Sequence, residues 1–239
     1  MPDHRAALFA ASCAYVEAIA TPRETLALAA GVSERDVDAI REAGALPAPT
    51  YVIFANAIHS PIRDLGLPPS DGGGRAFYCP AVLPHLRRAA LMLAQGDDLA
   101  RRLEAWLAAS LTVAAREQAD DAQLYAWTHL FQSDGALNDD AVQAEARQLG
   151  DDWLGGGWAV CLRRWDGRHI VTKDLERARI AALTDDGKRE KLSGDERLAL
   201  FDAINRLDAL MLPFAPYERP HGTPGLFIDQ MQTRYRLWA

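Results

Sequence analysis

In the first 96 residues, short runs with regularly spaced apolar residues are separated by Gly and Pro. This pattern predicts short helices around a small β element. Thr21, Pro22 and Glu24 form a predicted helix start, with Thr21 as N-cap and Glu24 completing a capping box. Ser33 is the predicted cap of the next helix. The loop 55–76 is rich in Pro and Gly. The expected elements are helices over 4–19, 22–30, 34–43 and 80–94, with strands at 51–54 and 77–78.

Residues 97–239 carry apolar positions at helical spacing, which predicts a helical bundle. Asn138 and Ser193 are predicted caps, and the three glycines 155–157 interrupt the helical pattern. Prolines make 213–224 a predicted rigid, extended segment. The expected helices cover 97–119, 121–132, 139–149, 194–211 and 226–235, with one more that begins at Thr172 or Asp174 and ends near Leu183.

These elements predict a mainly α protein with two domains, 1–96 and 97–239. The first domain resembles the winged helix-turn-helix of MerR-type regulators in residues 28–33, 44–47, Tyr78 and 86–88. The helix that would enter the DNA groove carries four acidic side chains and only two arginines, which disfavours phosphate contacts. We therefore expect the fold to serve as a scaffold, with no nucleic-acid partner.

Composition narrows the class of protein further. The net charge of −7 over 239 residues argues against general affinity for nucleic acids or membrane surfaces. The three cysteines are widely spaced and form no metal-ligand pattern, so we expect a cytoplasmic protein without a structural metal. The apolar run 6–20 is interrupted by polar residues, which favours an amphipathic helix over a signal peptide.

The stretch 153–173 concentrates candidate chemistry. It holds three tryptophans, and its apolar run 158–162 is followed at once by Arg163 and Arg164, with Lys173 further on. An apolar floor with a rim of donors is typical of a pocket wall. It is equally typical of an ordinary buried element with a solvated end, and the pattern leaves both interpretations open.

A family resemblance rests on three segments: 158–163 followed by 170–173, then 207–219, and 46–51 near the N-terminus. Together they resemble the DUF6058 family of bacterial proteins. The glycine-rich entry 155–157 and the link before Ile170 depart from the usual pattern. Through a relative of this type, the larger subunit of an azinomycin-type aziridine synthase, the resemblance implies natural-product biosynthesis. The implied reaction is an amine displacing a neighbouring sulfate ester, with no cofactor and with a small protein partner.

That reaction needs a base for the amine, cationic groups for the departing sulfate, and walls that exclude water. We expect His59 or Asp64 to be the base, and Arg63, Arg163 and Arg219 to hold the anion of a small biosynthetic intermediate. The remaining candidates for the pocket are Tyr51, Cys161, Lys173 and Tyr217. A solvated loop around His59 and an inert buried Cys161 are the plainer alternatives. A ligand-sensing regulator and a non-catalytic metabolite-binding or resistance protein are the alternative functions.

Overall fold

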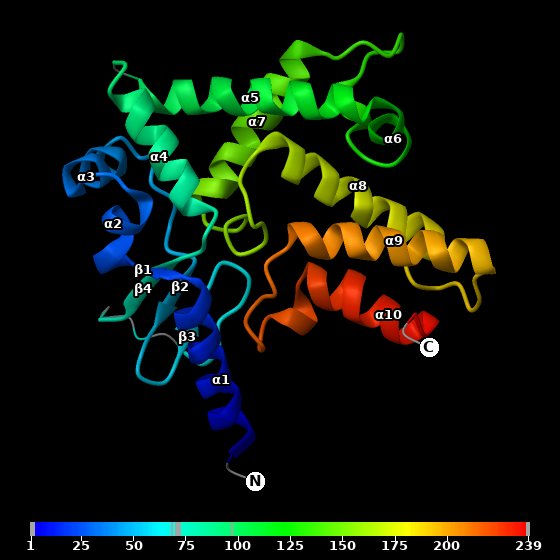
Figure 1. The fold of residues 1–239 in the computed structure, drawn as a ribbon, viewed down its shortest axis with the longest axis horizontal. Coiled ribbons are helices and arrows are strands. Elements are labelled where there is room, and N and C mark those ends of the chain that lie inside the picture. Colours follow the sequence, from blue (N-terminus) through cyan, green and yellow to red (C-terminus); the bar gives the residue numbers. More distant parts are fainter. Residues whose placement is uncertain (1–2, 68, 70–72, 97, 238–239) are drawn as a thin grey trace.

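The computed structural model describes residues 3–67, 69, 73–96 and 98–237. Figure 1 shows a small sheet with the N-terminal helices at one end of the molecule and the remaining helices over the rest. The described part is mainly helical, as predicted, and buried apolar residues from both halves form one continuous core. Within these ranges, no helix combines the length and the apolarity needed to cross a bilayer.

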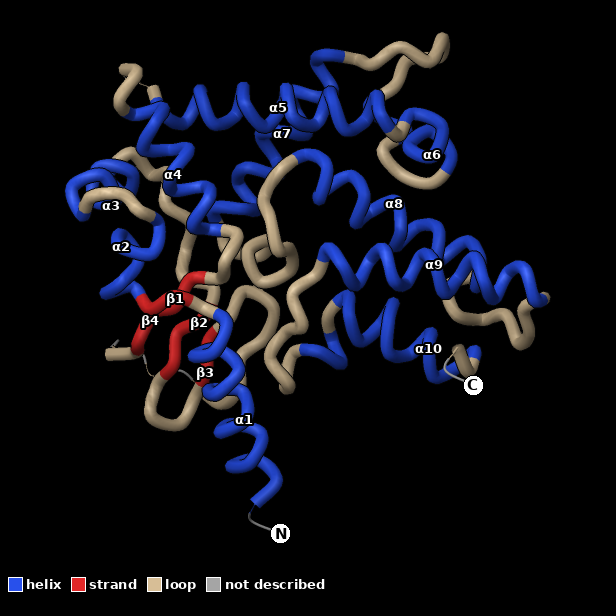
Figure 2. The backbone as a smooth tube through the Cα atoms, viewed as in Figure 1, coloured by secondary structure: helices blue, strands red, loops and turns tan. Residues whose placement is uncertain are grey.

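The N-terminal part packs helices beside a sheet of very short strands (Figure 2). Gly31 and Gly44 end α2 and α3 with positive φ angles, and Ser33 caps α3 through a full capping box with Asp36. Helices α2 and α3 both pack against α4. The helices are α1 (Asp3–Ile19), α2 (Leu26–Ala30), α3 (Glu34–Glu42) and α4 (Val82–Leu93), and a 3₁₀ turn covers Arg23–Thr25.

The sheet is antiparallel, with the strand order β1-β4-β2-β3. The predicted helix start at Thr21 was wrong, because Thr21 and Pro22 form an edge strand that pairs with Tyr78 and Phe77. An edge position suits proline, which has no N–H to donate. The strands are β1 (Thr21–Pro22), β2 (Tyr51–Ile53), β3 (Ile58–His59) and β4 (Arg75–Tyr78).

The helical part is built on α8, which packs against both α5 and α9, while α5 also packs against α7 (Figure 1). Asn138 and Ser193 cap their helices as predicted. The expected helix 121–132 was wrong, because Trp127 adopts a positive φ of 63° and separates α6 from a 3₁₀ turn at Thr128–Leu130. The helices are α5 (Leu99–Glu117), α6 (Ala119–Leu124), α7 (Asp139–Leu154), α8 (Gly167–Thr184) and α9 (Gly194–Leu210).

The stretch between α7 and α8 is a set of turns, not a regular element. Two backbone hydrogen bonds connect it to residues at and just after the end of α9. The Arg163 N–H donates to the Leu210 carbonyl (3.0 Å), and the Leu212 N–H donates to the Cys161 carbonyl (2.9 Å). Trp153 and Trp165 stack at its base, with ring centroids 4.6 Å apart. The run is only partly buried, since Trp158 and Cys161 keep some exposure.

The tail after α9 folds back toward the N-terminal sheet and then runs beside α9 (Figure 1). The expected extended segment is interrupted by a 3₁₀ turn at Arg219–His221. The last expected helix begins as a π-helix, Pro224–Asp229, and continues as α10, Gln230–Tyr235.

Candidate functional site

A cleft with a volume of 1330 Å³ lies between α5, α8 and α9. Four arginines and one histidine reach into it, together with four carboxylates, so we call it the arginine cleft. Its apolar wall comes from α5 and from the end of α9. The polar and charged residues that line it are Ser110, Glu117, Gln118, Asp121, Arg164, Asp166, Arg168, His169, Thr172, Glu176, Arg179 and Arg206.

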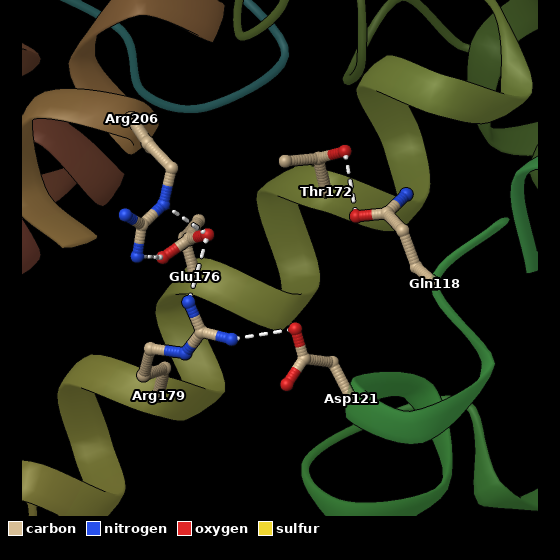
Figure 3. Close-up of polar contacts among 6 residues, drawn as sticks. All are labelled: Gln118, Asp121, Thr172, Glu176, Arg179 and Arg206. Atoms are coloured by element: carbon tan, nitrogen blue, oxygen red, sulfur yellow. Dashed lines mark hydrogen bonds and ion pairs between the residues drawn. The ribbon is translucent and has the colours of Figure 1, made fainter. Parts of the chain in front are cut away.

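One wall of the cleft is an ion-pair network centred on Glu176 of α8 (Figure 3). Glu176 is 4% exposed and accepts two hydrogen bonds from the Arg206 guanidinium, at 2.7 Å from Nε and 3.0 Å from Nη2. Arg179 lies 3.5 Å from the same carboxylate and 2.6 Å from Asp121. Hydrogen bonding to Glu176 raises the pKa of Arg206. These contacts fix the two guanidinium groups and neutralise much of their charge.

Next to this network, the amide of Gln118 faces the hydroxyl of Thr172 (Figure 3). The hydroxyl donates to the amide oxygen at 3.1 Å. The Gln118 Nε2 is buried and makes no hydrogen bond to the part of the chain that the structure describes. Buried donors of this kind are usually paired, so Gln118 has one donor that the described contacts leave unused.

At the mouth of the cleft, Asp166 and His169 form a pair at the N-terminus of α8. Asp166 is the N-cap and accepts from the backbone N–H of His169 at 2.9 Å. The same oxygen, Oδ1, lies 2.8 Å from the His169 Nδ1. Burial disfavours the charged form of Asp166, but hydrogen bonds from His169 and the nearby charges of His169 and Arg164 outweigh it and lower the pKa. A carboxylate that holds Nδ1–H leaves Nε2 as the free basic nitrogen.

Arg164 and Arg168 flank this pair. Both have exposed side chains, and neither makes an ion pair or a side-chain hydrogen bond within the described ranges. Arg179 and Arg206 are already engaged by carboxylates, whereas these two guanidinium groups keep all their donors. They are the groups best placed to hold an anion in the cleft.

The residues expected from the sequence lie elsewhere, and some of them meet. Tyr51 and Tyr217 are both buried on either side of Glu218, which is 0% exposed. The Tyr51 hydroxyl donates to Glu218 Oε2 at 2.8 Å, and the Ser60 hydroxyl donates to Oε1. Burial raises the pKa of Glu218, although these hydrogen bonds oppose the shift. This buried cluster joins the sheet to the tail.

The other predicted loop residues are more exposed. His59 and Asp64 do meet, with 2.7 Å between Nδ1 and Oδ1, and both side chains are about half exposed. Arg63 has an exposed side chain without an ion-pair partner in the described structure. The expectation that these residues supply a base and an anion site remains a prediction.

The three predicted arginines do not form a common site in the described contacts. Arg219 is engaged by both Asp229 oxygens at 2.8 Å and by the Pro213 carbonyl at 2.7 Å. Arg163 has an exposed side chain. Cys161 and Lys173 lie together in a separate groove that also includes Trp158. Burial raises the pKa of the Cys161 thiol, while the nearby charge of Lys173 opposes this.

The sequence interpretation missed the Asp166–His169 pair, Arg168, Glu176 and Arg206. It took Asp166 and Gly167 for a turn and began the helix several residues too late. A signal was present, because a capping residue followed at the third helical position by a polar side chain is the pattern that located the cap at Ser193.

The geometry defines a mainly helical protein with an arginine-lined cleft and a carboxylate–histidine pair at its mouth. The chain belongs to a family of unknown function, DUF6058, whose model matches residues 112–236. The matched range contains most of the arginine cleft and lies within the predicted second domain. Comparisons with curated proteins and with solved structures found no match.

Proposed function

We propose that this protein is an enzyme acting on an anionic small molecule in the arginine cleft, with His169 as the general base. The observation that carries the proposal is the 2.8 Å contact between Asp166 and the His169 Nδ1, beside two arginines that have no ion-pair partner among the described residues. The carboxylate orients the imidazole, and Nε2 can then take a proton from a substrate held by Arg164 and Arg168. Gln118 and Thr172 add neutral hydrogen-bonding groups for orientation.

The more specific proposal is intramolecular displacement of a sulfate ester by an amine. The amine nitrogen forms a bond to the neighbouring carbon, the carbon–oxygen bond to sulfate breaks, and the amine proton passes to His169. Negative charge grows on the departing sulfate, where Arg164 and Arg168 would stabilise it. The step is redox-neutral, and its atoms balance without a further reactant. The proposed role in natural-product biosynthesis rests on the family resemblance.

The experiment uses the purified full chain with 2-amino alcohol O-sulfates as probe substrates, and measures inorganic sulfate by ion chromatography and the ring product by mass spectrometry. Loss of a general base typically costs about 10²- to 10⁴-fold in rate, so His169→Gln should reduce turnover at least about 100-fold. His129→Gln is the matched control, because His129 also pairs with a carboxylate, Glu145 at 2.9 Å, but does not line the arginine cleft. Equal turnover by His169→Gln and the wild type would refute the base assignment.

A second experiment distinguishes an enzyme from a non-catalytic binding protein. A cellular metabolite extract is incubated with the protein, and bound and consumed species are compared by mass spectrometry. An anionic metabolite that is retained but never consumed, and is lost in Arg168→Ala, would identify a non-catalytic metabolite-binding protein. Consumption that depends on both His169 and Arg168 supports the enzyme.

A DNA-binding regulator is the second candidate function, because α2 and α3 are two short helices joined through Gly31 that pack on α4 and precede β2, β3 and β4, as a helix–turn–helix would. The outer face of α3 argues against it, since Glu34, Asp36, Asp38 and Glu42 outnumber its two arginines. Arg41 is also paired with Asp38. Salt-dependent binding to duplex DNA would favour this function.

A further inference from the structure

A buried lysine outside the arginine cleft has an unusual environment. Lys173 of α8 is 5% exposed, and its ammonium lies 3.8 Å above the Trp158 ring. Among the described residues it makes no ion pair within 4.0 Å and no hydrogen bond. Lysine is rarely buried this far without a partner. The face of Trp158 partly compensates the charge but accepts no proton.

The ammonium is not sealed in the core, because Lys173 lines an open groove of 410 Å³. One wall of the groove is glycine backbone from Gly155 and Gly157, and the floor is Trp158 and Cys161. A side-chain carbon added at Gly157 would meet nothing closer than the Asp152 carbonyl at 3.8 Å, so this wall leaves space for a ligand. The groove therefore presents one amine at the base of a small, partly apolar site.

The buried environment of Lys173 changes the protonation of its amine and therefore its reactivity. Burial lowers the pKa of Lys173, and the neighbouring Cys161 and Asp174 only partly oppose the shift. More of the side chain is consequently in the neutral form at neutral pH than for an exposed lysine. A neutral amine is a nucleophile, whereas an ammonium is not.

The charge at the rim of the groove favours a neutral ligand over an anion. Asp151 and Asp152 line the groove with exposed side chains, so an anion approaching Lys173 would pass two carboxylates. A neutral carbonyl compound would meet no such repulsion, and it is the functional group with which a neutral amine condenses. The chemistry of the groove favours an aldehyde or a ketone.

We propose that Lys173 captures a small aldehyde or ketone in this groove as an imine. The amine nitrogen bonds to the carbonyl carbon, and the carbonyl oxygen leaves as water with the two amine protons, so the step is redox-neutral and balanced. This site is separate from the arginine cleft, because Thr172, Glu176 and Arg179 face the cleft from α8 while Lys173 lines the other groove. The proposal therefore does not depend on the role of His169.

The chain allows a clean test because it contains three lysines, Lys173, Lys188 and Lys191. Lys188 and Lys191 are exposed and serve as internal controls. The full chain is treated at pH 7 with butanal and sodium cyanoborohydride, which reduces an imine to a stable alkylamine. Peptide mapping by mass spectrometry then gives the labelling rate at each lysine.

Lys173 is expected to be labelled about tenfold faster than either exposed lysine, despite its burial. A rate at or below that of Lys188 or Lys191 would overturn the proposal. Lys173→Arg should abolish the fast labelling while the rates at the two exposed lysines stay unchanged. Cys161→Ser should keep the fast labelling. If the fast labelling of Lys173 is lost in Cys161→Ser, the Cys161 thiol is the group that reacts with the carbonyl compound, and this result would also overturn the proposal.

Discussion

The backbone N–H of Gly167, the first residue of α8, donates to the side-chain hydroxyl of Ser110 in α5 at 2.8 Å. A Cβ at Gly167 would collide with the Ser110 carbonyl and with the Leu111 nitrogen, which are both main-chain atoms. Two of the three helices that line the arginine cleft, α5 and α8, therefore approach so closely because position 167 has no side chain.

Gly167→Ala should lower the free energy of unfolding by about 2 kcal/mol, because helix backbones cannot move aside as a flexible side chain can. Gly194→Ala is the control, since Gly194 is also the first residue of a helix and a Cβ there meets nothing within 4 Å. It should stabilise by about 0.5 kcal/mol. Urea denaturation of both variants checks this. Similar effects of the two changes would contradict the close contact.

Arg206→Met should cost about 2 kcal/mol of stability, because it removes both short contacts to the buried Glu176 and leaves that carboxylate with Arg179 at 3.5 Å. The same change in a Glu176→Gln background should cost less, since no buried charge is stranded. A double-mutant cycle from urea unfolding measures the difference. A coupling energy near zero would mean that the pair contributes little.

Glu218→Gln should flatten the pH dependence of stability. The pKa of Glu218 is raised from 4.5 by burial, so as pH rises above 4.5 the unfolded chain loses this proton before the folded chain does. The stability contributed by the protonated carboxyl is fully present below pH 4.5 and is lost as pH rises through the folded-state pKa. Between pH 5 and 8, as the test range, the wild type should therefore lose stability relative to the variant.

The Glu218 measurement is a series of urea titrations at several pH values. Glu196→Gln serves as the opposite control, because hydrogen bonding to Arg189 lowers the pKa of Glu196 to about 2. Its contribution to the wild type should be present above pH 4.5 and be lost as the pH falls toward 2. Parallel profiles for the wild type and Glu218→Gln would show that the carboxyl is not perturbed.

Lys173→Met should raise stability by about 1 kcal/mol at neutral pH. Burying an ammonium without a charged partner costs several kcal/mol, and a desolvated cation–π contact returns about 2 kcal/mol of this. Because the pKa of Lys173 is lowered, this cost is largest below the folded-state pKa, decreases as pH rises from there toward 10.5, and is absent above 10.5. Thermal unfolding compares this variant with Lys188→Met, which should change stability by less than about 0.5 kcal/mol.

Much of the fold could be predicted where local signals act alone. Ser33 and Ser193 begin their helices because each hydroxyl satisfies a free backbone N–H, and Gly31 and Gly44 end theirs because they accept positive φ angles. Thr21 and Pro22 show where this fails. The local sequence favours a helix start, but pairing with Tyr78 and Phe77 in a strand far along the chain wins.

The candidate site was harder to predict because its members come from separate helices. Arg206 contributes to it only because α9 packs on α8, and the sequence does not state that contact. Arg219 was a reasonable anion ligand by chemical type, yet Asp229 ten residues later engages it. The sequence identifies side chains that could bind an anion by their type. Ion pairs formed in the folded chain then determine which of these side chains remain available to bind it.

The buried carboxyl of Glu218 has a consequence for synthesis of the chain. Its hydrogen-bond partners Tyr51 and Ser60 precede it by 167 and 158 residues. At about 5–20 residues per second, the ribosome needs roughly 8–32 s to deliver Glu218 after Ser60. During this interval the nascent sheet carries two hydroxyls whose final acceptor does not yet exist. The N-terminal part can reach its final packing only after the tail has been made.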